Sequence, residues 1–369
     1  MIRLSKSVVG KAESAAVAHV IEDIGYLGMG SVVHDFEEAL ENYIGGGYRC
    51  ICVNSGTAAL HLAVQAVTQP GDEVLVPSFT FVSTYQAITG AGCKPISCEI
   101  DPKTLTLDLK DAEKRITPKT TAILPVYYAS NITMVEAYQK FAKDHHLRLI
   151  EDAAHAFGCS WKGKKIGSFG DVVCFSFDGI KNITSGEGGA VFTADPDIIN
   201  KISDARLLGV MKDSEKRYAG KRSYDFDVVA QGYRYHMSNI FAAIGLVQLG
   251  RFEKEFAPKR RYIARKYTEL LKDNPNVELI PMDYDDSIVP HIFPIKVLNG
   301  KRELLIERFK ELDIQYGIQY RPNHTLTYFK SGYALPVTED VFSKIISIPM
   351  HPELTDENIR LITDTINGI

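Results

Sequence analysis

The chain has 369 residues, a formal net charge of −4 at pH 7, 45% hydrophobic residues and 24% charged residues. These values are typical of a globular protein, and the nearly balanced charge, with no block of about five like charges, argues against nucleic acid or an anionic membrane as a partner. There is no apolar signal core at the N-terminus and no run of about 18 apolar residues, so we expect a soluble, cytoplasmic protein that binds small molecules.

The cysteine pattern argues against a metal site and against disulfides. None of the cysteines forms a C-x-x-C pair, and most lie in apolar, strand-like runs. We therefore expect buried free thiols and no bound metal. The cysteines are Cys50, Cys52, Cys93, Cys98, Cys159 and Cys174.

The first two thirds of the chain alternate between helical and strand-like patterns. Two amphipathic helices are predicted at 11–22 and 32–43, ahead of a strand at 49–53. Further strands are predicted at 73–76, 95–100, 121–126, 147–150, 172–177 and 190–193, and further helices at 58–67 and from residues 80, 134 and 196. Because parallel strands need long crossovers, this alternation predicts a mostly parallel sheet covered by helices on both faces.

The pattern changes at about residue 240. A long helical segment, 239–271, contains the cationic run Lys259-Arg260-Arg261, which we interpret as a solvated face. The segments predicted after it are strands at 289–297, 314–318 and 344–348 and helices at 302–312 and 355–366. We therefore expect a large domain at 1–240, including the N-terminal helices, and a bridging helix with a small C-terminal domain at 241–369.

Chemically useful side chains follow two of the predicted strands. The stretch Ser168 to Gly189 places a single lysine, Lys181, in a loop rich in Gly, Ser and Thr after a strand. Another strand end, at 146–150, leads directly to Asp152 and His155. The carboxyl ends of parallel strands lie at one edge of a sheet, where open α/β folds bind their ligands. We therefore expect the amine, the carboxylate and the imidazole to meet at that edge.

A third strand end has the form of a phosphate-binding turn. The strand at 49–53 runs through Asn54-Ser55-Gly56-Thr57 into a helix. The free N–H groups and the dipole at such a helix start can hold a phosphate. Many turns of this kind bind nothing, so the turn gains weight only together with the other residues.

Together these groups match the requirements of pyridoxal 5′-phosphate. A partly desolvated lysine has its ammonium form disfavoured, and its neutral amine can form a Schiff base with an aldehyde. Asp152 would keep the pyridine nitrogen protonated, and His155 would donate to the phenolic oxygen. The other expected cofactor contacts are Gly56, Thr57 and Ser176 for the phosphate and Phe81 for the ring face.

Each of these residues also has a simpler structural interpretation. Lys181 could be a solvated surface lysine, and Asp152 could be only a helix N-cap. Phe81 and His155 could be core residues, and Ser176 an ordinary strand residue. Their joint order along the chain and their common position at strand ends favour the cofactor site.

Several long sequence blocks occur in the order found in one enzyme family. They are NSGTAALHLA (54–63), GDEVLVPSFTFVST (71–84), EDAAHAFG (151–158), GSFGDVVCFSF with IKNITSGEGG (167–189), GYRYHMSNIFAAIGLVQL (232–249) and IPMHPELT (348–355). With these blocks the chain resembles, over essentially its whole length, the DegT/DnrJ/EryC1/StrS sugar-nucleotide aminotransferases. The resemblance implies an α/β protein of the fold type I pyridoxal-phosphate aminotransferase class, with a mostly parallel large-domain sheet flanked by helices and a smaller α+β C-terminal domain.

The resemblance also implies roles for individual residues. Lys181 stands where the family has its covalent cofactor lysine, and Arg234 stands where a residue reaches the cofactor phosphate of the neighbouring subunit in a homodimer. The other cofactor contacts that it implies are the ones given above: Gly56, Thr57, Phe81, Asp152, His155 and Ser176. By position alone, Glu187, Tyr320 and His324 are candidates for contact with the sugar.

The chain departs from the family pattern at several positions near the expected substrate. Arg234 replaces a frequent Asn, His236 a usual Arg, and Asp178 a residue that is often His. The turn Tyr127-Tyr128-Ala129-Ser130 replaces a more usual H-x-Y-G. We therefore expect contacts to the sugar nucleotide that differ from those of other members.

The GEGG run at 186–189 resembles members that aminate C4 of a 4-keto-6-deoxyhexose. It implies transfer of the amino group of L-glutamate to dTDP-4-keto-6-deoxy-D-glucose, for surface polysaccharide or O-antigen biosynthesis. A GDP-linked 4-keto sugar and a dTDP-linked 3-keto sugar remain alternative substrates, and a non-catalytic regulator with the same fold remains an alternative of another class. The deoxygenating dehydratases of the family carry His at the position of Lys181, so the lysine argues against that activity.

Overall fold

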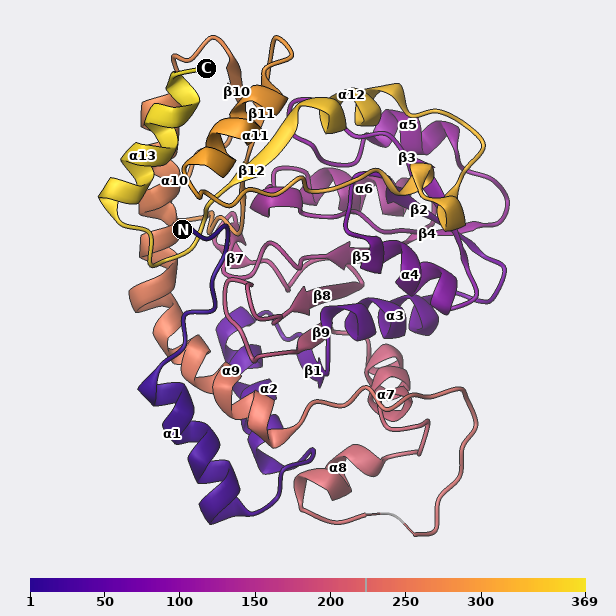
Figure 1. Ribbon diagram of the computed structural model, residues 1–369. Coiled ribbons are helices and arrows are strands. Elements are labelled where there is room, and N and C mark those ends of the chain that lie inside the picture. Colours follow the sequence, from indigo (N-terminus) through magenta and orange to yellow (C-terminus); the bar gives the residue numbers. More distant parts are fainter. Residues whose placement is uncertain (223) are drawn as a thin grey trace.

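The computed structural model describes residues 1–222 and 224–369, and a seven-stranded sheet runs through the middle of the molecule (Figure 1). In sheet order the strands are β1 (Arg49–Val53), β9 (Gly189–Thr193), β8 (Val172–Ser176), β5 (Arg148–Asp152), β4 (Thr120–Ile123), β2 (Glu73–Pro77) and β3 (Lys94–Cys98). Strand β9 is antiparallel to both of its neighbours, and all other adjacent pairs are parallel. The prediction of a mostly parallel sheet is confirmed.

Apolar side chains cover both faces of this sheet, as a parallel sheet requires. Successive residues of β1 show the alternation: Ile51 and Val53 belong to one buried cluster, and Cys50 and Cys52 to the other. The helices of the first cluster are α3 (Gly56–Val67), α4 (Val82–Gly90) and α7 (Pro196–Ala205). Those of the second include α2 (Ser31–Ile44), α6 (Val135–Asp144) and α9 (Asn239–Arg251), with α1 (Lys11–His19) packed against α9.

The structure contains a second, smaller sheet, formed by later segments of the chain. Its antiparallel strands are β10 (Val277–Leu279), β11 (Phe293–Val297) and β12 (Ile345–Ile348). Helices α10 (Ala257–Leu271), α11 (Arg302–Glu311) and α13 (Asp356–Asn367) accompany it. The helical segment of α9 and α10 runs along the left side of the molecule in Figure 1, from beside the large sheet to beside the small one. The division of the chain into two domains at residue 240 stays a prediction.

The secondary structure differs from the prediction mainly in short elements. The strand predicted at 314–318 contributes only isolated bridges, between Ile2 and Ile314 and between Gly317 and Ser347. The elements without a sequence prediction are α5 (Leu109–Lys114), α8 (Asp213–Tyr218), α12 (Pro336–Lys344), strand β10 and the hairpin of β6 (Ser160–Trp161) and β7 (Lys164–Lys165). Apart from α12, these elements have six residues or fewer, which is too short to show a hydrophobic period.

The interpretation of Lys259-Arg260-Arg261 as a solvated face is wrong for its two arginines. Arg260 is 2% exposed, and its Nη1 donates to the carbonyl oxygens of Pro290 (3.3 Å) and His291 (3.1 Å). Arg261 is 9% exposed and donates from Nε to the carbonyl oxygen of Ile288 (3.0 Å). The segment that leads into β11 has carbonyl groups without strand partners, and the two guanidinium groups satisfy them.

The six cysteines are buried and free, which confirms the prediction made from their spacing. Burial raises the pKa of the Cys50 and Cys174 thiols well above its ordinary value, so these thiols stay protonated and unreactive. Among residues 1–222 and 224–369, no helix combines the length and the apolar character needed to cross a membrane.

Candidate active site

A cavity of about 320 Å³ lies at the carboxyl ends of the parallel strands. Most of the side chains predicted for the site line it, together with Asp178 and Gln319. The predicted residues in its wall are Gly56, Thr57, Phe81, Asp152, His155, Ser176, Lys181, Glu187 and Tyr320. Two predicted residues, Arg234 and His324, lie outside this wall.

The start of α3 forms an anion cradle on one side of the cavity. Ser55 caps the helix by accepting a hydrogen bond from the Ala58 amide (3.1 Å). A Cβ atom at Gly56 would lie 2.7 Å from Cβ of Ser176, so only glycine lets the end of β8 approach the helix this closely. The first amides of a helix have no intrahelical acceptor, and the helix dipole favours negative charge there. With the Ser176 hydroxyl in the same cavity wall, this arrangement fits a phosphate group.

Asp152, at the end of β5, supplies a buried carboxylate. It is 4% exposed, accepts a hydrogen bond from Thr84 Oγ1 at 2.9 Å, and accepts another from the Ala154 amide at 3.1 Å. Burial raises the pKa of this carboxyl, while the two hydrogen bonds and the nearby Lys181 act in the opposite direction. A carboxylate fixed in a dry site is the partner that a protonated pyridine nitrogen needs, so the residues present fit pyridoxal 5′-phosphate.

Lys181 enters the cavity from the loop after β8. Asn182 anchors this loop by donating hydrogen bonds to the carbonyl oxygens of Phe157 (3.0 Å) and Val289 (3.1 Å). Burial lowers the pKa of Lys181, and Asp152 and Asp178 offset part of this effect. A larger fraction of the amine is therefore neutral at neutral pH than for a solvated lysine, and the neutral amine is the nucleophile.

His155 and two aromatic rings close another part of the cavity. The Ala129 amide donates to Nδ1 of His155 (3.3 Å), so the ring proton lies on Nε2, which is 3.1 Å from the Tyr320 hydroxyl. Burial, and to a smaller extent Lys181, keeps the pKa of His155 well below its ordinary value, so the ring is neutral. Phe81 remains 54% exposed at the cavity, with its ring centroid 5.5 Å from that of Tyr320, and offers a flat face to a ligand.

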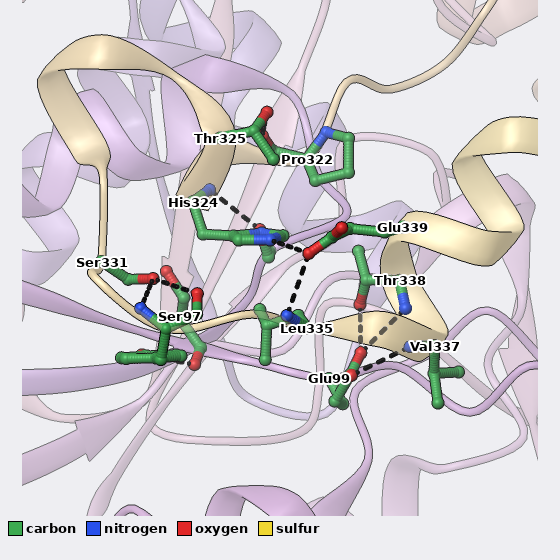
Figure 2. Close-up of polar contacts among 12 residues, drawn as sticks. Ser97, Glu99, Pro322, His324, Thr325, Ser331, Leu335, Val337, Thr338 and Glu339 are labelled. Atoms are coloured by element: carbon green, nitrogen blue, oxygen red, sulfur yellow. Dashed lines mark hydrogen bonds and ion pairs between the residues drawn. The ribbon is translucent and has the colours of Figure 1, made fainter.

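Arg234 and His324 lie in other surroundings. Arg234 is exposed, and its backbone carbonyl accepts a hydrogen bond from Asn54 Nδ2 (3.2 Å). His324 is 4% exposed, and its Nδ1 lies 2.7 Å from Ser78 Oγ. Its Nε2 lies 3.0 Å from Glu339 Oε1, and Figure 2 shows the two side chains pointing toward each other. In this structure His324 therefore contacts other parts of the protein rather than the cavity.

His324 belongs to a segment that we call the strap, residues 319–339, which also carries Gln319 and Tyr320 into the cavity wall. The Glu99 carboxylate, just after β3, anchors the far end of the strap at the start of α12 (Figure 2). It accepts hydrogen bonds from the amides of Val337 (3.0 Å) and Thr338 (2.9 Å) and from Thr338 Oγ1 (2.6 Å). One buried acid thus holds three donors at a helix N-terminus.

Replacing Glu99 with Gln is expected to loosen the strap. The amide keeps one acceptor oxygen and loses the charge, so about 1–3 kcal/mol of unfolding free energy should be lost. Hydrogen exchange should accelerate at the amides of Val337 and Thr338, both of which bond to Glu99. The exposed surface acid Glu303 is the control, and Glu303→Gln should leave both measurements near wild type. Unchanged exchange in Glu99→Gln would show that the carboxylate does not anchor the strap.

The site contains residues that the sequence did not single out. Gln319 lines the cavity, Thr84 orients Asp152, and His291 Nε2 lies 3.5 Å from Lys181 Nζ. Thr84 stood in a stretch already associated with the site, but Gln319 and His291 are more than a hundred residues from Lys181 in sequence and lie in segments without a local motif. Only their tertiary placement identifies them.

Comparison with known proteins agrees with this geometry. The model of the DegT/DnrJ/EryC1/StrS aminotransferase family matches residues 8–367. A dTDP-4-dehydro-2,3,6-trideoxy-D-glucose 4-aminotransferase of Saccharopolyspora spinosa is 33% identical over 369 residues, which is 99% of this chain and 95% of the relative. PseC of Helicobacter pylori, an aminotransferase involved in the biosynthesis of pseudoaminic acid, superposes with a TM-score of 0.91 at 28% identity and covers 100% of this chain and 98% of its own.

A further solved structure bears on the cofactor. The putative sugar aminotransferase Spr1654 of Streptococcus pneumoniae, in its PLP-form, has a TM-score of 0.90 and 26% identity, covering 100% of this chain and 98% of its own. The resemblance, the fold type I architecture, the cofactor and the enzyme class predicted from the sequence are confirmed. The chain therefore belongs to the DegT/DnrJ/EryC1/StrS family and is a pyridoxal 5′-phosphate-dependent sugar aminotransferase.

Proposed function

We propose that this enzyme transfers the amino group of L-glutamate to a nucleotide-linked keto-deoxysugar, with dTDP-4-keto-6-deoxy-D-glucose as the preferred acceptor. The observation that carries the proposal is the single cavity in which an amine, a buried carboxylate and a helix N-terminus converge. The GEGG run at 186–189 supports amination at C4, and so does the name of the Saccharopolyspora spinosa relative, which specifies a dTDP-linked sugar and a 4-aminotransferase. The product would serve surface polysaccharide synthesis, such as that of an O-antigen.

The proposed cofactor contacts divide the cavity into two ends. The amides of Gly56 and Thr57 and the hydroxyl of Ser176 would bind the phosphate at one end. At the other end Asp152 would hold the pyridine nitrogen in its protonated form. His155 would donate to the phenolic oxygen and Phe81 would cover the ring face, since both residues lie in the cavity wall.

Lys181 is proposed to move the protons. Pyridoxal 5′-phosphate, when bound, supplies an electron sink for the electron pair that is left when the C–H bond of the amino donor breaks. Lys181 Nζ takes that Cα proton from glutamate, and in the second half-reaction it returns a proton to the sugar carbon that receives nitrogen. The neutral amine that burial favours is the form able to act as the base.

The sugar is proposed to bind between Glu187, Tyr320 and Gln319, which line the cavity beside Lys181. His324 would act on this subsite only through the strap, because it contacts Ser78 and Glu339. Arg234 is exposed and outside the cavity wall of its own chain. We propose that it reaches the cofactor phosphate of a second copy, in a homodimer with active sites shared between subunits.

A substrate panel tests the proposal. The enzyme is incubated with L-glutamate and dTDP-, GDP- and UDP-linked sugars in 4-keto and 3-keto forms, and products are identified by mass and by the position of nitrogen in NMR spectra. We expect the dTDP-linked 4-keto sugar to be converted with the highest kcat/KM and to carry nitrogen at C4. If a GDP-linked or 3-keto sugar is converted with the highest kcat/KM, the dTDP-linked 4-keto sugar is not the preferred acceptor. If none of the sugars is converted, the proposed substrate class is wrong.

A further inference from the structure

A second imidazole, that of His291 just before β11, faces the Lys181 amine. His291 is 3% exposed, and its Nε2 atom lies 3.5 Å from Lys181 Nζ. Its ring packs against the ring of His155, with centroids 4.5 Å apart and an interplanar angle of 49°. The other ring nitrogen, Nδ1, is buried and has no hydrogen-bond partner among the described residues.

The protein fixes His291 from two sides. The Ser130 hydroxyl accepts a hydrogen bond from the His291 amide (3.0 Å) and donates one to the His155 carbonyl, so one hydroxyl ties the two histidines together. On the other side Arg260 Nη1 donates to the His291 carbonyl at 3.1 Å. Ser130 and its neighbour Ala129 have φ angles of 68° and 52°, which are strained for residues other than glycine. Backbone strain of this kind is kept where the surroundings need a particular geometry.

Burial and the neighbouring charged groups act differently on the protonation of His291 and of Lys181. Burial, with smaller effects of Lys181, His155 and Arg260, keeps the pKa of His291 well below its ordinary value, so the imidazole is neutral. Lys181 also feels burial, but Asp152 and Asp178 act to keep its proton. A neutral imidazole with its ring proton on Nδ1 can accept a hydrogen bond at Nε2 from the Lys181 amine or ammonium group. A contact of 3.5 Å is long for such a bond, and such contacts often tighten when ligands bind.

A role in packing alone does not account for this histidine. Burying an imidazole with an unpartnered ring nitrogen is unfavourable relative to a satisfied group, and phenylalanine would fill a similar space without that cost. Nε2 of His291 contacts Lys181 Nζ, and Nδ1 has no hydrogen-bond partner among the described residues. Among the described residues, the imidazole thus has its polar contact with the amine of the candidate catalytic lysine.

We propose that His291 is the positioning residue for Lys181: its imidazole accepts a hydrogen bond from Nζ and holds the amine at the cavity wall whenever the amine is free. This inference rests on the role proposed above for Lys181. Without the imidazole, the flexible lysine side chain would no longer be held in one orientation. The amine would then spend less time in the position needed for proton transfer, and proton transfer would slow. Binding of the sugar nucleotide, which involves other parts of the cavity, would change little.

Three variants of His291 separate positioning from packing. His291→Phe fills the site and removes both ring nitrogens. His291→Gln extends a polar group toward the place of Nε2, whereas His291→Asn keeps polarity but withdraws it from Lys181. The matched control is His351→Phe, because His351 is also buried, with 6% exposed, and has Arg260, Glu353 and Lys6 rather than Lys181 as its charged neighbours. The Asn and Gln variants keep the test open if the Phe variant does not fold.

The first measurement uses cofactor-free protein and needs no turnover. The rate at which cyanate carbamoylates Lys181 is followed from about pH 6 to about pH 10 by peptide mass spectrometry, since only the neutral amine reacts. In His291→Phe the midpoint should move to lower pH by about one unit, because the charged amine loses a hydrogen-bond acceptor. His291→Asn should show the same shift, whereas His291→Gln and His351→Phe should stay near wild type.

The second measurement is steady-state kinetics of the holoenzyme. We expect His291→Phe and His291→Asn to lower kcat about tenfold or more with KM within about twofold, and His291→Gln to recover most of kcat. An unchanged carbamoylation midpoint in His291→Phe and His291→Asn, or an equal shift in His351→Phe, would overturn the inference. If Lys181→Ala instead retained full activity, the proposed function of Lys181 would fail, while the carbamoylation result would still report on its contact with His291.

Discussion

Replacement of Lys181 by alanine is expected to abolish amino transfer while leaving the fold intact. Lys181 is proposed as both the covalent attachment point and the carrier of the proton, and among the described residues of the cavity wall no other lysine could replace its amine. The loss in kcat should be at least about 10⁴-fold, in the range found when a central nucleophile or base is removed. The same variant should lose the visible absorbance of the covalently attached cofactor.

The stability of Lys181→Ala should remain close to that of the wild type. Because burial lowers the pKa of Lys181, the native state holds this charge less favourably than the unfolded chain does, so its removal should change unfolding free energy by no more than about 1 kcal/mol at neutral pH. Circular dichroism and urea unfolding check this expectation. Lys164→Ala, at an exposed lysine of the β7 hairpin, is the control and should keep full activity. Activity near wild type in Lys181→Ala would refute the assignment of the lysine.

Replacement of Asp152 by asparagine is the second large effect. The amide is nearly isosteric and can still accept the hydrogen bond of the Ala154 amide, and the Thr84 hydroxyl can rotate to suit the new group. The negative charge that would keep the pyridine nitrogen protonated is lost. We expect kcat to fall by about 10²–10³-fold, the scale seen when one preorganised electrostatic partner of a reacting group is removed. Steady-state kinetics with glutamate and the best acceptor of the substrate panel would measure the loss.

The neighbouring acid provides a matched control for Asp152. Glu151 is also buried on β5, but it points to the opposite face of the sheet and accepts a hydrogen bond from the Tyr127 hydroxyl. Burial raises its pKa to about 7, so the carboxyl is already partly neutral near neutral pH. Glu151→Gln should therefore retain activity within about twofold. Equal losses in Asp152→Asn and Glu151→Gln would mean that the effect comes from disturbing the strand rather than from charge in the cavity.

The sequence predicted the main sheet well because its strands are short apolar runs bounded by turns and separated by amphipathic helices. Strand β1 was predicted with its observed limits, and the ends of the other large-sheet strands moved by only a few residues. The prediction failed where the chain has no period of its own. Strand β10 spans only three residues, and the predicted strand at 314–318 pairs through single bridges.

The cationic run in α10 shows a different kind of failure. Three consecutive basic residues are usually solvated, and nothing local distinguishes Arg260 and Arg261 from Lys259. Their burial depends on the carbonyl groups of residues 286–291, which need donors because this segment does not pair in a sheet. A demand for hydrogen-bond donors that arises about thirty residues away cannot be recognised from the pattern of the helix itself.

By itself, the sequence determined the sheet edge at which the candidate catalytic residues lie, since Lys181, Asp152 and the helix start at Gly56 each lie at or shortly after a strand end and parallel strands end together. Only the tertiary structure decided what surrounds that edge. It placed His291 against Lys181, turned His324 toward Ser78 and Glu339, and left Arg234 exposed outside the cavity. The reason is physical: strand ends are fixed by local hydrophobic periodicity, whereas these three side chains are oriented by contacts with segments distant in sequence, which no local pattern encodes.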